Sequence, residues 1–225
     1  MIKLIVFDWD DVFTIGSKEG YFACYHNALL AVGVELTPEE EEHRIVAKWG
    51  QSHREELKEL LKEHPERVDE ACEQYEKELF GNTFVDALHV LDGVQELLER
   101  LGKKYTLTVV TGQHHDIFWK HVTPKFNIPK VFSKVVSAYQ LPKEHQKPDP
   151  YPIRQMMEEY DVTAEETIMV GDSISDVQMA KNAGILPVVV LTGYLNREKA
   201  EALGVQHIIK DVREIEEVLE NLEVN

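Results

Sequence analysis

Cysteine, basic side chains and long apolar runs are all scarce in this chain. Only two of the 225 residues are cysteines, Cys24 and Cys72, and they lack metal-ligand spacing, which argues against a disulfide framework and a zinc site. No stretch approaches the roughly 20 apolar residues that a membrane span requires. Met1 leads into a strand-like segment instead of a basic and apolar leader. We therefore expect a cytoplasmic protein with buried thiols and no membrane partner.

The shortage of basic side chains gives the chain a strongly acidic balance. Its 24 Lys and Arg residues stand against 41 Asp and Glu residues, for a formal net charge of −17. Such a surface repels nucleic acid and anionic membranes alike, so neither is an expected partner. An apolar share of 43% and an aromatic share of 8% are typical of a folded globular protein. The composition leaves both a monomer and a homodimer open.

Short apolar segments alternate with helical patterns over most of the chain. Turn residues bound each segment or apolar residues at helical spacing follow it, which is typical of a parallel α/β sheet. The predicted strands are 2–7, 105–111, 131–137, 167–171 and 186–191. The predicted helices are 93–101, 114–122, 150–160, 174–183, 196–203 and 212–222. The expected fold class is therefore α/β, with a Rossmann-like parallel sheet as its core.

The segment 17–86 has a different pattern from the rest. Charged and apolar residues alternate there at helical period throughout, with no convincing strand. Turn and helix-start signals divide the segment into about four helices of ordinary length. We expect an insertion of about four helices over 17–86 into an α/β core formed by 1–16 and 87–225.

Three carboxylates follow the first predicted strand within four positions, in Asp8-Trp9-Asp10-Asp11. Ligands of parallel sheets bind outside the carboxyl ends of the strands, so this clustering favours chemistry. In a phosphate-ester hydrolase, Asp8 would be a nucleophile that forms an aspartyl-phosphate, and Asp10 would be the acid and base. Extended residues two apart point the same way, which suits such a pair. A solvated turn or a helix cap is the alternative for this motif alone.

A second acidic group follows another apolar strand, in Gly171-Asp172-Ser173-Ile174-Ser175-Asp176. Asp172 and Asp176 would share one side of the helix that begins there. Together with Asp8 they offer the hard oxygen ligands that Mg²⁺ prefers. The alternative makes Asp172 a helix N-cap and Asp176 a partner of the helix dipole.

Two further strand ends carry groups that suit a phosphoryl ligand. Thr111 ends the strand Leu107-Thr108-Val109-Val110 and offers a hydroxyl, and Lys147 in Gln146-Lys147-Pro148-Asp149-Pro150 offers a cation. A phosphoryl group among aspartates requires at least one fixed positive charge besides the metal, and Lys147 can supply it. The alternative for Lys147 alone is a solvated surface side chain.

In combination these segments resemble the haloacid dehalogenase-like hydrolase superfamily. Its four motifs are matched in order by Asp8-x-Asp10-x-Val12, Thr111, Lys147 and Gly171-Asp172-Ser173-x-x-Asp176. The resemblance implies a nucleophile that also binds Mg²⁺, an acid/base residue, and groups that hold the phosphoryl. Asp8 would be the nucleophile and Asp10 the acid/base residue. Thr111, Lys147 and the amide of Gly112 would hold the phosphoryl group. It further implies that the backbone carbonyl of Asp10 and the carboxylates of Asp172 and Asp176 complete the metal site.

Within the superfamily, the presence of Asp10 favours phosphatases and phosphomutases over dehalogenases and phosphonate hydrolases. The chain most resembles the phosphoglycolate phosphatase-like branch with a helical cap. It departs from that branch at Asp11 and Val12, where many members have Gly and Thr, and at Gly112-Gln113, where a Thr-Asn pair is frequent. The implied function is a Mg²⁺-dependent phosphatase of a small phosphorylated metabolite. A phosphomutase of the beta-phosphoglucomutase type and a non-catalytic binding protein with this fold are the alternatives.

Substrate preference is expected to depend on the helical insert, because a cap that closes over the site adds contacts to the leaving group. Lys48 and Gln51 lie where one insert helix ends and a turn begins, a position that resembles the specificity loop of helical-cap members. We hypothesise that both side chains touch the leaving group. A solvated helix end is the alternative.

Overall fold

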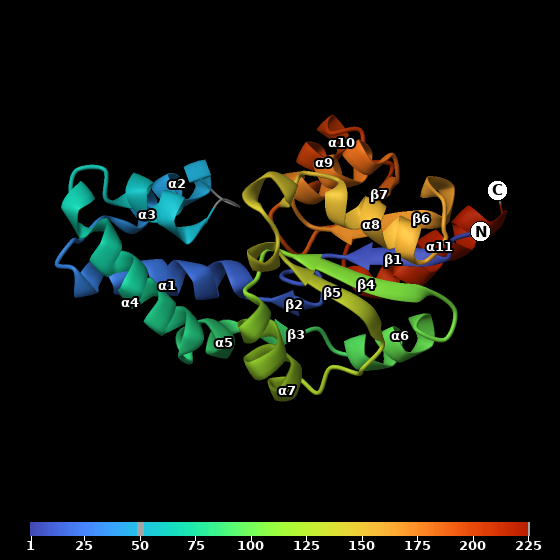
Figure 1. The fold of residues 1–225 in the computed structure, drawn as a ribbon, viewed down its shortest axis with the longest axis horizontal. Helices are drawn as coiled ribbons and strands as arrows, with labels where there is room; N and C mark the ends of the chain where they lie inside the picture. Colours follow the sequence, from blue (N-terminus) through green and yellow to red (C-terminus); the bar gives the residue numbers. More distant parts are fainter. Residues whose placement is uncertain (49–51, 225) are drawn as a thin grey trace. The chain divides into compact units, whose positions relative to one another are not determined.

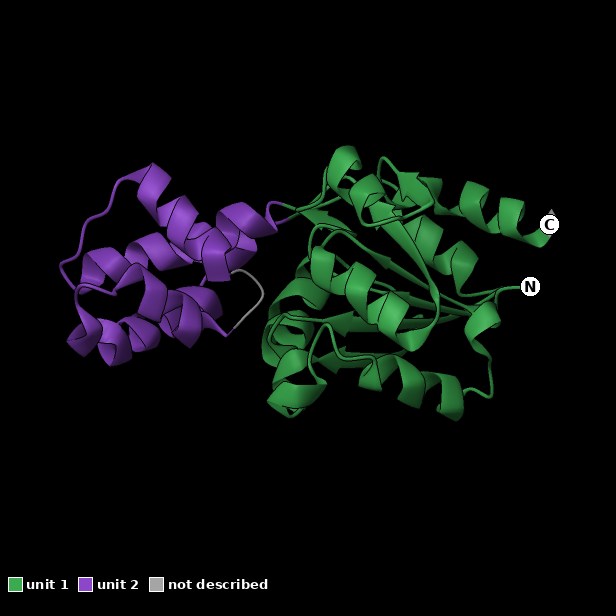
Figure 2. Ribbon diagram, turned by 90° about the horizontal axis from the view of Figure 1, so that it is seen from above, with its two compact units in different colours: residues 1–15, 89–225 green, residues 16–88 purple. Residues whose placement is uncertain are grey.

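The structure is a computed structural model that describes residues 1–48 and 52–224. The chain divides into two compact units, which Figure 2 colours separately. Unit 1 consists of Met1–Ile15 together with His89–Asn225, and unit 2 consists of Gly16–Leu88. The chain therefore leaves unit 1 after Ile15 and returns to it at His89, so unit 2 is an insertion.

Unit 1 is built on a six-stranded sheet in the order β5-β4-β1-β6-β7-β8, and all neighbouring strands are parallel (Figure 1). This confirms the predicted α/β fold class. The strands are β1 Leu4–Phe7, β4 Thr106–Thr111, β5 Phe132–Ser137, β6 Thr167–Gly171, β7 Leu186–Val190 and β8 His207–Ile209. Strand β8 was not predicted, because it is an edge strand of three residues and too short to show a period.

Helices connect these strands and lie on both faces of the sheet (Figure 2). The α-helices are α6 Val94–Leu101, α7 Thr123–Lys125, α8 Tyr151–Glu159, α9 Ile174–Ala183, α10 Arg197–Ala202 and α11 Ile215–Val224. The predicted helix 114–122 instead contains a π-helical segment, η2 Ile117–Val122. Short 3₁₀ turns complete the connections: η3 Ala138–Gln140, η4 Lys143–His145, η5 Ala164–Glu166 and η6 Val212–Glu214.

Strand β1 occupies the middle of the sheet because both of its faces are apolar. All four of its side chains are fully buried. Successive side chains of a strand point to opposite faces, and those of Leu4 and Val6 join a core cluster with Ile153, Met156 and Met179 from α8 and α9. Each such side chain stabilises the fold by about 1.5–3 kcal/mol. The residues that follow β1 are therefore held at the centre of the carboxyl edge of the sheet.

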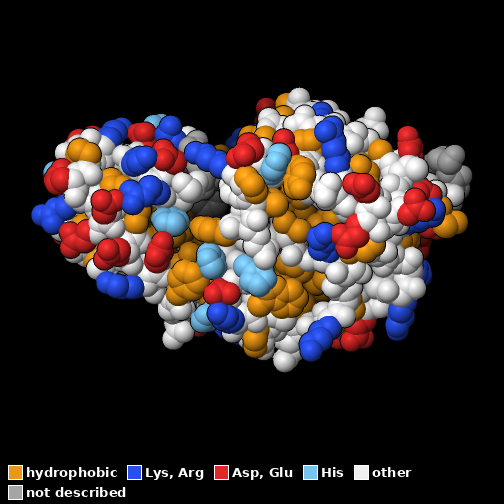
Figure 3. Space-filling model, viewed as in Figure 1, with side chains coloured by type: hydrophobic (Ala, Val, Ile, Leu, Met, Phe, Trp, Pro, Cys, Tyr) orange, Lys and Arg blue, Asp and Glu red, His pale blue; other side chains and the backbone are white. Residues whose placement is uncertain are grey.

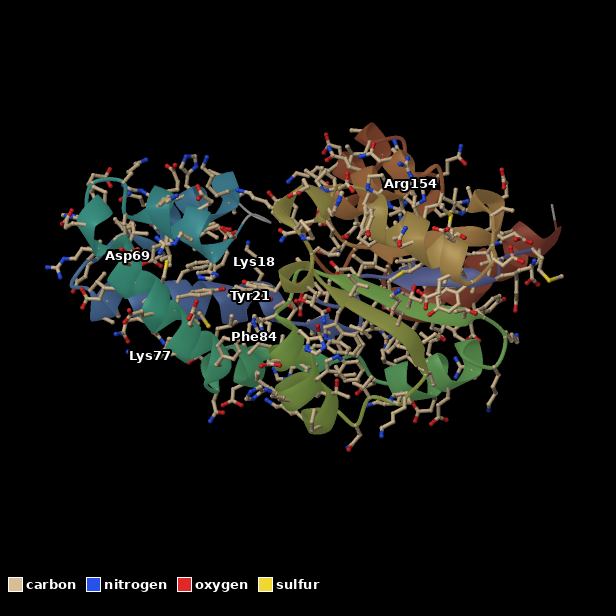
Figure 4. The ribbon with its side chains drawn as sticks, viewed as in Figure 1. Lys18, Tyr21, Asp69, Lys77, Phe84 and Arg154 are labelled. Atoms are coloured by element: carbon tan, nitrogen blue, oxygen red, sulfur yellow. The ribbon has the colours of Figure 1, made fainter. Side chains whose placement is uncertain are left out.

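Contacts between α8 and α9 also fix the outer layer of unit 1. Arg154 on α8 donates a 2.9 Å hydrogen bond to the backbone carbonyl of Asn182 near the end of α9 (Figure 4). A two-stranded antiparallel sheet pairs β2 Thr14–Ile15 with β3 His89–Val90. These strands belong to unit 1 and flank the insertion in the sequence.

The described residues of unit 2 form helices without a strand. They are α1 Ser17–Ala31, α2 Pro38–Lys48, α3 His53–Leu60, α4 Val68–Phe80 and α5 Thr83–Ala87, with a 3₁₀ turn η1 Pro65–Arg67. About four helices were expected in this segment, and α5, a short helix of five residues that follows Gly81-Asn82, was not predicted as a separate helix. The rings of Tyr21 on α1 and Phe84 on α5 lie 4.4 Å apart (Figure 4).

The surface carries charges of both signs in local pairs. Figure 3 shows acidic and basic side chains interspersed on the face in view, and one such pair joins Arg54 to Asp69 at 2.7 Å. None of the helices among residues 1–48 and 52–224 is long and apolar enough to cross a membrane. Cys24 and Cys72 are buried free thiols.

Candidate active site

Asp8 lies at the carboxyl end of β1, where the sheet register places it beside β6. Phe7 is level with Val170, and the backbone N–H of Asp8 donates to the Val170 carbonyl at 2.9 Å. One carboxylate oxygen, Oδ1, accepts the backbone N–H of Trp9 at 2.6 Å. The residue is only 8% exposed. The turn after β1 thus holds this carboxylate in a fixed orientation at the sheet edge.

Asp176 reaches the same edge from the first turn of α9. Its Oδ2 accepts the hydroxyl of Ser173 at 2.7 Å and the Ser173 backbone N–H at 3.1 Å. The N-cap of α9 is Ser173, whose hydroxyl in turn accepts the Asp176 N–H at 3.3 Å. This reciprocal capping box begins the helix. The capping box uses Oδ2 of Asp176, while Oδ1 faces the ammonium group of Lys147.

Asp172 is held by a loop that the sequence analysis did not single out. The sequence alternative of an N-cap is not what the structure shows, because Asp172 Oδ2 instead accepts the backbone N–H of Tyr194 at 2.9 Å. The approach depends on Gly193, where a Cβ would lie 2.0 Å from Asp172 Oδ2. A Cβ at Gly171 would similarly lie 2.5 Å from the Asp176 carboxylate. Only glycine permits the backbone to come this close to both carboxylates.

Lys147 extends its ammonium group between two of these carboxylates. Its Nζ is 2.9 Å from Asp8 Oδ2 and 2.7 Å from Asp176 Oδ1. Hydrogen bonds hold the loop at the residues on both sides of Lys147. Gln146 Nε2 donates to the backbone carbonyls of Ala138 and Leu141, and Asn182 Nδ2 donates to that of Pro148. The Lys147 side chain is only 11% exposed and is anchored, so it is not the solvated side chain of the alternative interpretation.

The charges at this edge do not balance. Asp8, Asp172 and Asp176 are all buried, and each offers an oxygen within 4.8 Å of the others, whereas the one ammonium group of Lys147 pairs only with Asp8 and Asp176. Burial raises the pKa of Asp8 to about 6, against the opposing effect of Lys147. Burial and the charges of Asp176 and Asp8 raise the pKa of Asp172 well above its usual range. Burial alone would lower the pKa of Lys147, but the charges of Asp176 and Asp8 outweigh it and raise that pKa.

This donor set fits a hard divalent cation. All three groups are carboxylates, which are the ligands that Mg²⁺ binds in preference to nitrogen or sulfur. A cation among them would also remove the repulsion that the single ammonium group leaves uncompensated. The residues present therefore match the metal site implied by the sequence motifs.

Asp10, Thr111 and Gly112 lie at the ends of β1 and β4, which are neighbouring strands. Asp10 Oδ1 accepts the side-chain N–H of Gln113 at 2.8 Å. Thr111 is buried, and its hydroxyl oxygen accepts the backbone N–H of Gln113 at 3.0 Å. Gly112, which lies between Thr111 and Gln113 in the sequence, is exposed. Gln113 was noted in the sequence only as a departure from the motif, and the structure makes it the link between Asp10 and Thr111.

The turn between Asp10 and Val12 accounts for the other departure. Asp11 adopts a left-handed conformation with φ 55°, a region that glycine enters freely and aspartate tolerates better than most side chains. Its backbone carbonyl accepts the hydroxyl of Thr192. The loop that holds Asp172 and the turn that carries Asp10 are thus joined.

The predicted leaving-group contacts belong to unit 2. Lys48 is the last residue of α2 and is half-buried, and Gln51 lies outside the described residues. Arg44, on the same helix, is buried and bound to Glu40, to Glu63 and to the Leu60 carbonyl. Its contacts stabilise unit 2.

Comparisons with known proteins show which family the chain matches. A family model for the haloacid dehalogenase-like hydrolases matches residues 5–190. A phosphoglycolate phosphatase of Vibrio parahaemolyticus is 30% identical over 148 residues, and the match spans 64% of this chain and 64% of that relative's length.

Solved structures share the fold. A predicted phosphoglycolate phosphatase from Haemophilus somnus has a TM-score of 0.79 at 22% identity, covering 97% of this chain and 98% of that one. A Thermotoga maritima structure provisionally described as a beta-phosphoglucomutase has a TM-score of 0.73 at 24% identity, covering 98% and 99%.

Proposed function

The chain belongs to the haloacid dehalogenase-like hydrolases, and from that premise we propose that it is a Mg²⁺-dependent phosphatase of a small phosphate monoester. The observation that carries this proposal is the cluster of Asp8, Asp172 and Asp176, three buried carboxylates of which two pair with the ammonium group of Lys147. Burying like charges together is costly to folding. The cost is understandable if the cluster binds a cation and a phosphoryl group.

In the first chemical step a carboxylate oxygen of Asp8 attacks phosphorus. A bond forms between that oxygen and phosphorus, and the bond from phosphorus to the ester oxygen breaks. Asp10 gives its proton to the departing oxygen, which leaves as an alcohol. The product on the protein is an aspartyl-phosphate on Asp8.

In the second step the ionised Asp10 accepts a proton from water, and the water oxygen attacks phosphorus. The bond to the Asp8 oxygen breaks, inorganic phosphate forms and both aspartates return to their starting states. The same two residues therefore serve both halves of the reaction, with the acid of the first half acting as the base of the second.

The remaining residues hold charge and orient the phosphoryl group. Asp8, Asp172 and Asp176, with the backbone carbonyl of Asp10, would hold Mg²⁺, which when bound supplies positive charge to the phosphoryl oxygens. Thr111, the amide of Gly112 and Lys147 would bind those oxygens directly. The fixed position of Lys147 means that little reorganisation is needed as charge develops.

The substrate we propose is phosphoglycolate or a similarly small phosphorylated metabolite. Support comes from the partial match to a phosphoglycolate phosphatase. Lys48 and Gln51 remain our candidates for leaving-group contacts. The fold likeness to a beta-phosphoglucomutase, at 24% identity, does not by itself favour transfer to a second hydroxyl over transfer to water.

The test is phosphate release from phosphoglycolate, sugar phosphates, nucleotides and pyrophosphate, with and without Mg²⁺. We expect Mg²⁺-dependent turnover that Asp8→Asn lowers by at least about a thousandfold, because it removes the nucleophile. Asp211→Asn is the matched control, since Asp211 is another buried aspartate that binds Arg213 outside the site.

Three outcomes would contradict the proposal. Transfer of a labelled phosphoryl group to another sugar hydroxyl without net phosphate release would identify a mutase. A folded protein that releases phosphate from none of these compounds would point to a binding protein. Turnover that survives Asp8→Asn would exclude Asp8 as the nucleophile.

A further inference from the structure

Gln113 is a buried amide at the carboxyl edge of the sheet, and its contacts converge on the active site. It is 1% exposed. Its side-chain Nε2 donates to Asp10 Oδ1 at 2.8 Å. Its backbone N–H donates to the Thr111 hydroxyl at 3.0 Å, and its backbone carbonyl accepts the Ser137 hydroxyl at 2.6 Å. One residue thus connects the ends of β1, β4 and β5.

Only half of the buried amide group of Gln113 is used. The nitrogen is bonded to Asp10, but the side-chain oxygen is buried and has no hydrogen-bond donor among residues 1–48 and 52–224. Burying a polar atom without a partner opposes folding. An apolar side chain of the same length would avoid that cost. The amide is therefore retained at the expense of stability, as is common where a group serves function.

We propose that Gln113 is a positioning residue for Asp10, which fixes the carboxylate that gives and takes the proton in the phosphatase reaction. This inference rests on the proposed function. Gln113 touches neither the phosphoryl group nor the nucleophile in our account, and it acts by restricting the orientation of the Asp10 side chain through its Nε2–H. Small displacements of an acid or base from its proton partner lower rates steeply.

The backbone of Gln113 is anchored well enough for this task. Ser137 is fully buried at the end of β5, and its bond to the Gln113 carbonyl fixes the residue from the opposite side to Asp10. A restricted backbone leaves the side chain little freedom to take its amide elsewhere. Gln113 is therefore better suited to orient a carboxylate than a side chain on a free loop would be.

The experiment compares Gln113→Met with a matched control, Gln95→Met. Methionine keeps the length of glutamine but removes the amide. Gln95 is a partly buried glutamine of unit 1 whose Nε2 donates to the Phe126 carbonyl at 3.0 Å, outside the site. We expect Gln113→Met to lower kcat by about 10- to 100-fold with KM changed less than about threefold. Its Tm should equal or exceed that of the wild type. Gln95→Met should keep kcat and lower Tm.

A leaving-group series separates positioning from a general loss of structure. Departure of 4-nitrophenolate needs little protonation, whereas departure of an alkoxide needs the Asp10 proton. The deficit of Gln113→Met in kcat/KM should therefore be at least about fivefold smaller for 4-nitrophenyl phosphate than for an alkyl phosphate, since acid catalysis supplies a large factor only to the latter. In an Asp10→Asn background, Gln113→Met should have no further effect on the alkyl substrate.

Several results would overturn the inference, and they differ from failure of the proposed function. Wild-type turnover abolished by Asp8→Asn, together with a fully active Gln113→Met, would leave the phosphatase intact and remove Gln113 from it. Equal deficits for both leaving groups with a lowered Tm would assign Gln113 a structural role. If the wild type releases no phosphate from any ester, both proposals fail together.

Discussion

Each unit of this molecule buries charged side chains, but their surroundings differ. In unit 2 the guanidinium of Arg44 is 5% exposed and meets two carboxylates, Glu40 and Glu63, together with the Leu60 carbonyl. Both carboxylates are about half exposed, so water completes their solvation. In unit 1 the buried Asp8, Asp172 and Asp176 lie close together, and the ammonium group of Lys147 pairs with Asp8 and Asp176. Buried charge is satisfied in the first case and left in excess in the second.

The pKa shifts of Asp8 and Asp172 at the site have the opposite sign to those of two carboxylates that form hydrogen bonds in unit 2. Hydrogen bonds lower the pKa of Glu63, through Arg44, and of Glu78, through Thr83 and Asn27. Burial raises the pKa of Asp8 to about 6 and raises that of Asp172. Carboxylates that support the fold are thus stabilised in their charged form. Those at the site are destabilised in that form, which a bound cation would reverse.

The comparison teaches that an excess of buried charge of one sign marks the functional site better than burial alone. Both Arg44 and Lys147 are buried cations near aspartates or glutamates. The carboxylates that pair with Arg44 are about half exposed, whereas those that pair with Lys147 are themselves buried. Perturbed carboxylates in such a cluster are candidates for chemistry with a physical reason.

Among changes that keep all three carboxylates, the largest expected effect comes from displacing one of them. Gly193→Ala places a Cβ 2.0 Å from Asp172 Oδ2, so that side chain must move. A displacement of this order costs roughly a hundredfold in turnover. Steady-state kinetics at saturating Mg²⁺ should show the loss. Turnover equal to the wild type would mean that the position of Asp172 is not critical.

The next effect is the response of stability to the cation. Mg²⁺ at a hundred times its Kd should stabilise the protein by about 2.7 kcal/mol, which raises the Tm of a chain of 225 residues by roughly 5–10 °C. Asp172→Asn should weaken that response. Without the cation, the same variant should melt at or above the wild-type Tm, because like-charge repulsion is relieved. Thermal melts with EDTA and with Mg²⁺ measure both, and an unchanged wild-type Tm would oppose a cation site.

The smallest effect tests Arg44, the buried guanidinium of unit 2 that is fully paired by its neighbours. Arg44→Met removes the bonds to Glu40, Glu63 and Leu60. We expect a loss of about 2 kcal/mol in the free energy of unfolding, since the carboxylates left behind are solvated. Arg44→Lys keeps the charge without the planar fork and should lose less. Denaturant titration gives both values. A stabilised Arg44→Met would show that the two buried cations are not as different as we argue.

The sequence was sufficient to predict that charged side chains which follow apolar strands lie at one edge of the sheet. Asp8, Asp172 and Lys147 each follow an apolar strand, and parallel strands bring such positions to one edge. The sheet followed from the same segments. The short edge strand β8 and the short helix α5 were missed because three to five residues carry no measurable period.

Residues whose role depends on having no side chain, or on contacts that only the folded chain makes, could not be predicted in this way. Gly193 matters because it has no side chain, and nothing in its neighbourhood of the sequence indicates that its loop passes Asp172. Ser173 is the N-cap of α9, while the sequence offered Asp172 for that role. Gln113 appeared as a motif departure, and its meaning depends on a side chain 103 positions away in the chain.

The most direct test of the central claim is to trap the covalent intermediate on Asp8. Borohydride reduces an acyl phosphate to an alcohol, so an enzyme quenched during turnover should carry homoserine in place of Asp8. Peptide mass spectrometry locates the modified residue. Our account predicts modification at Asp8 alone, dependent on both substrate and Mg²⁺. Modification elsewhere, or none while phosphate is being released, would contradict it.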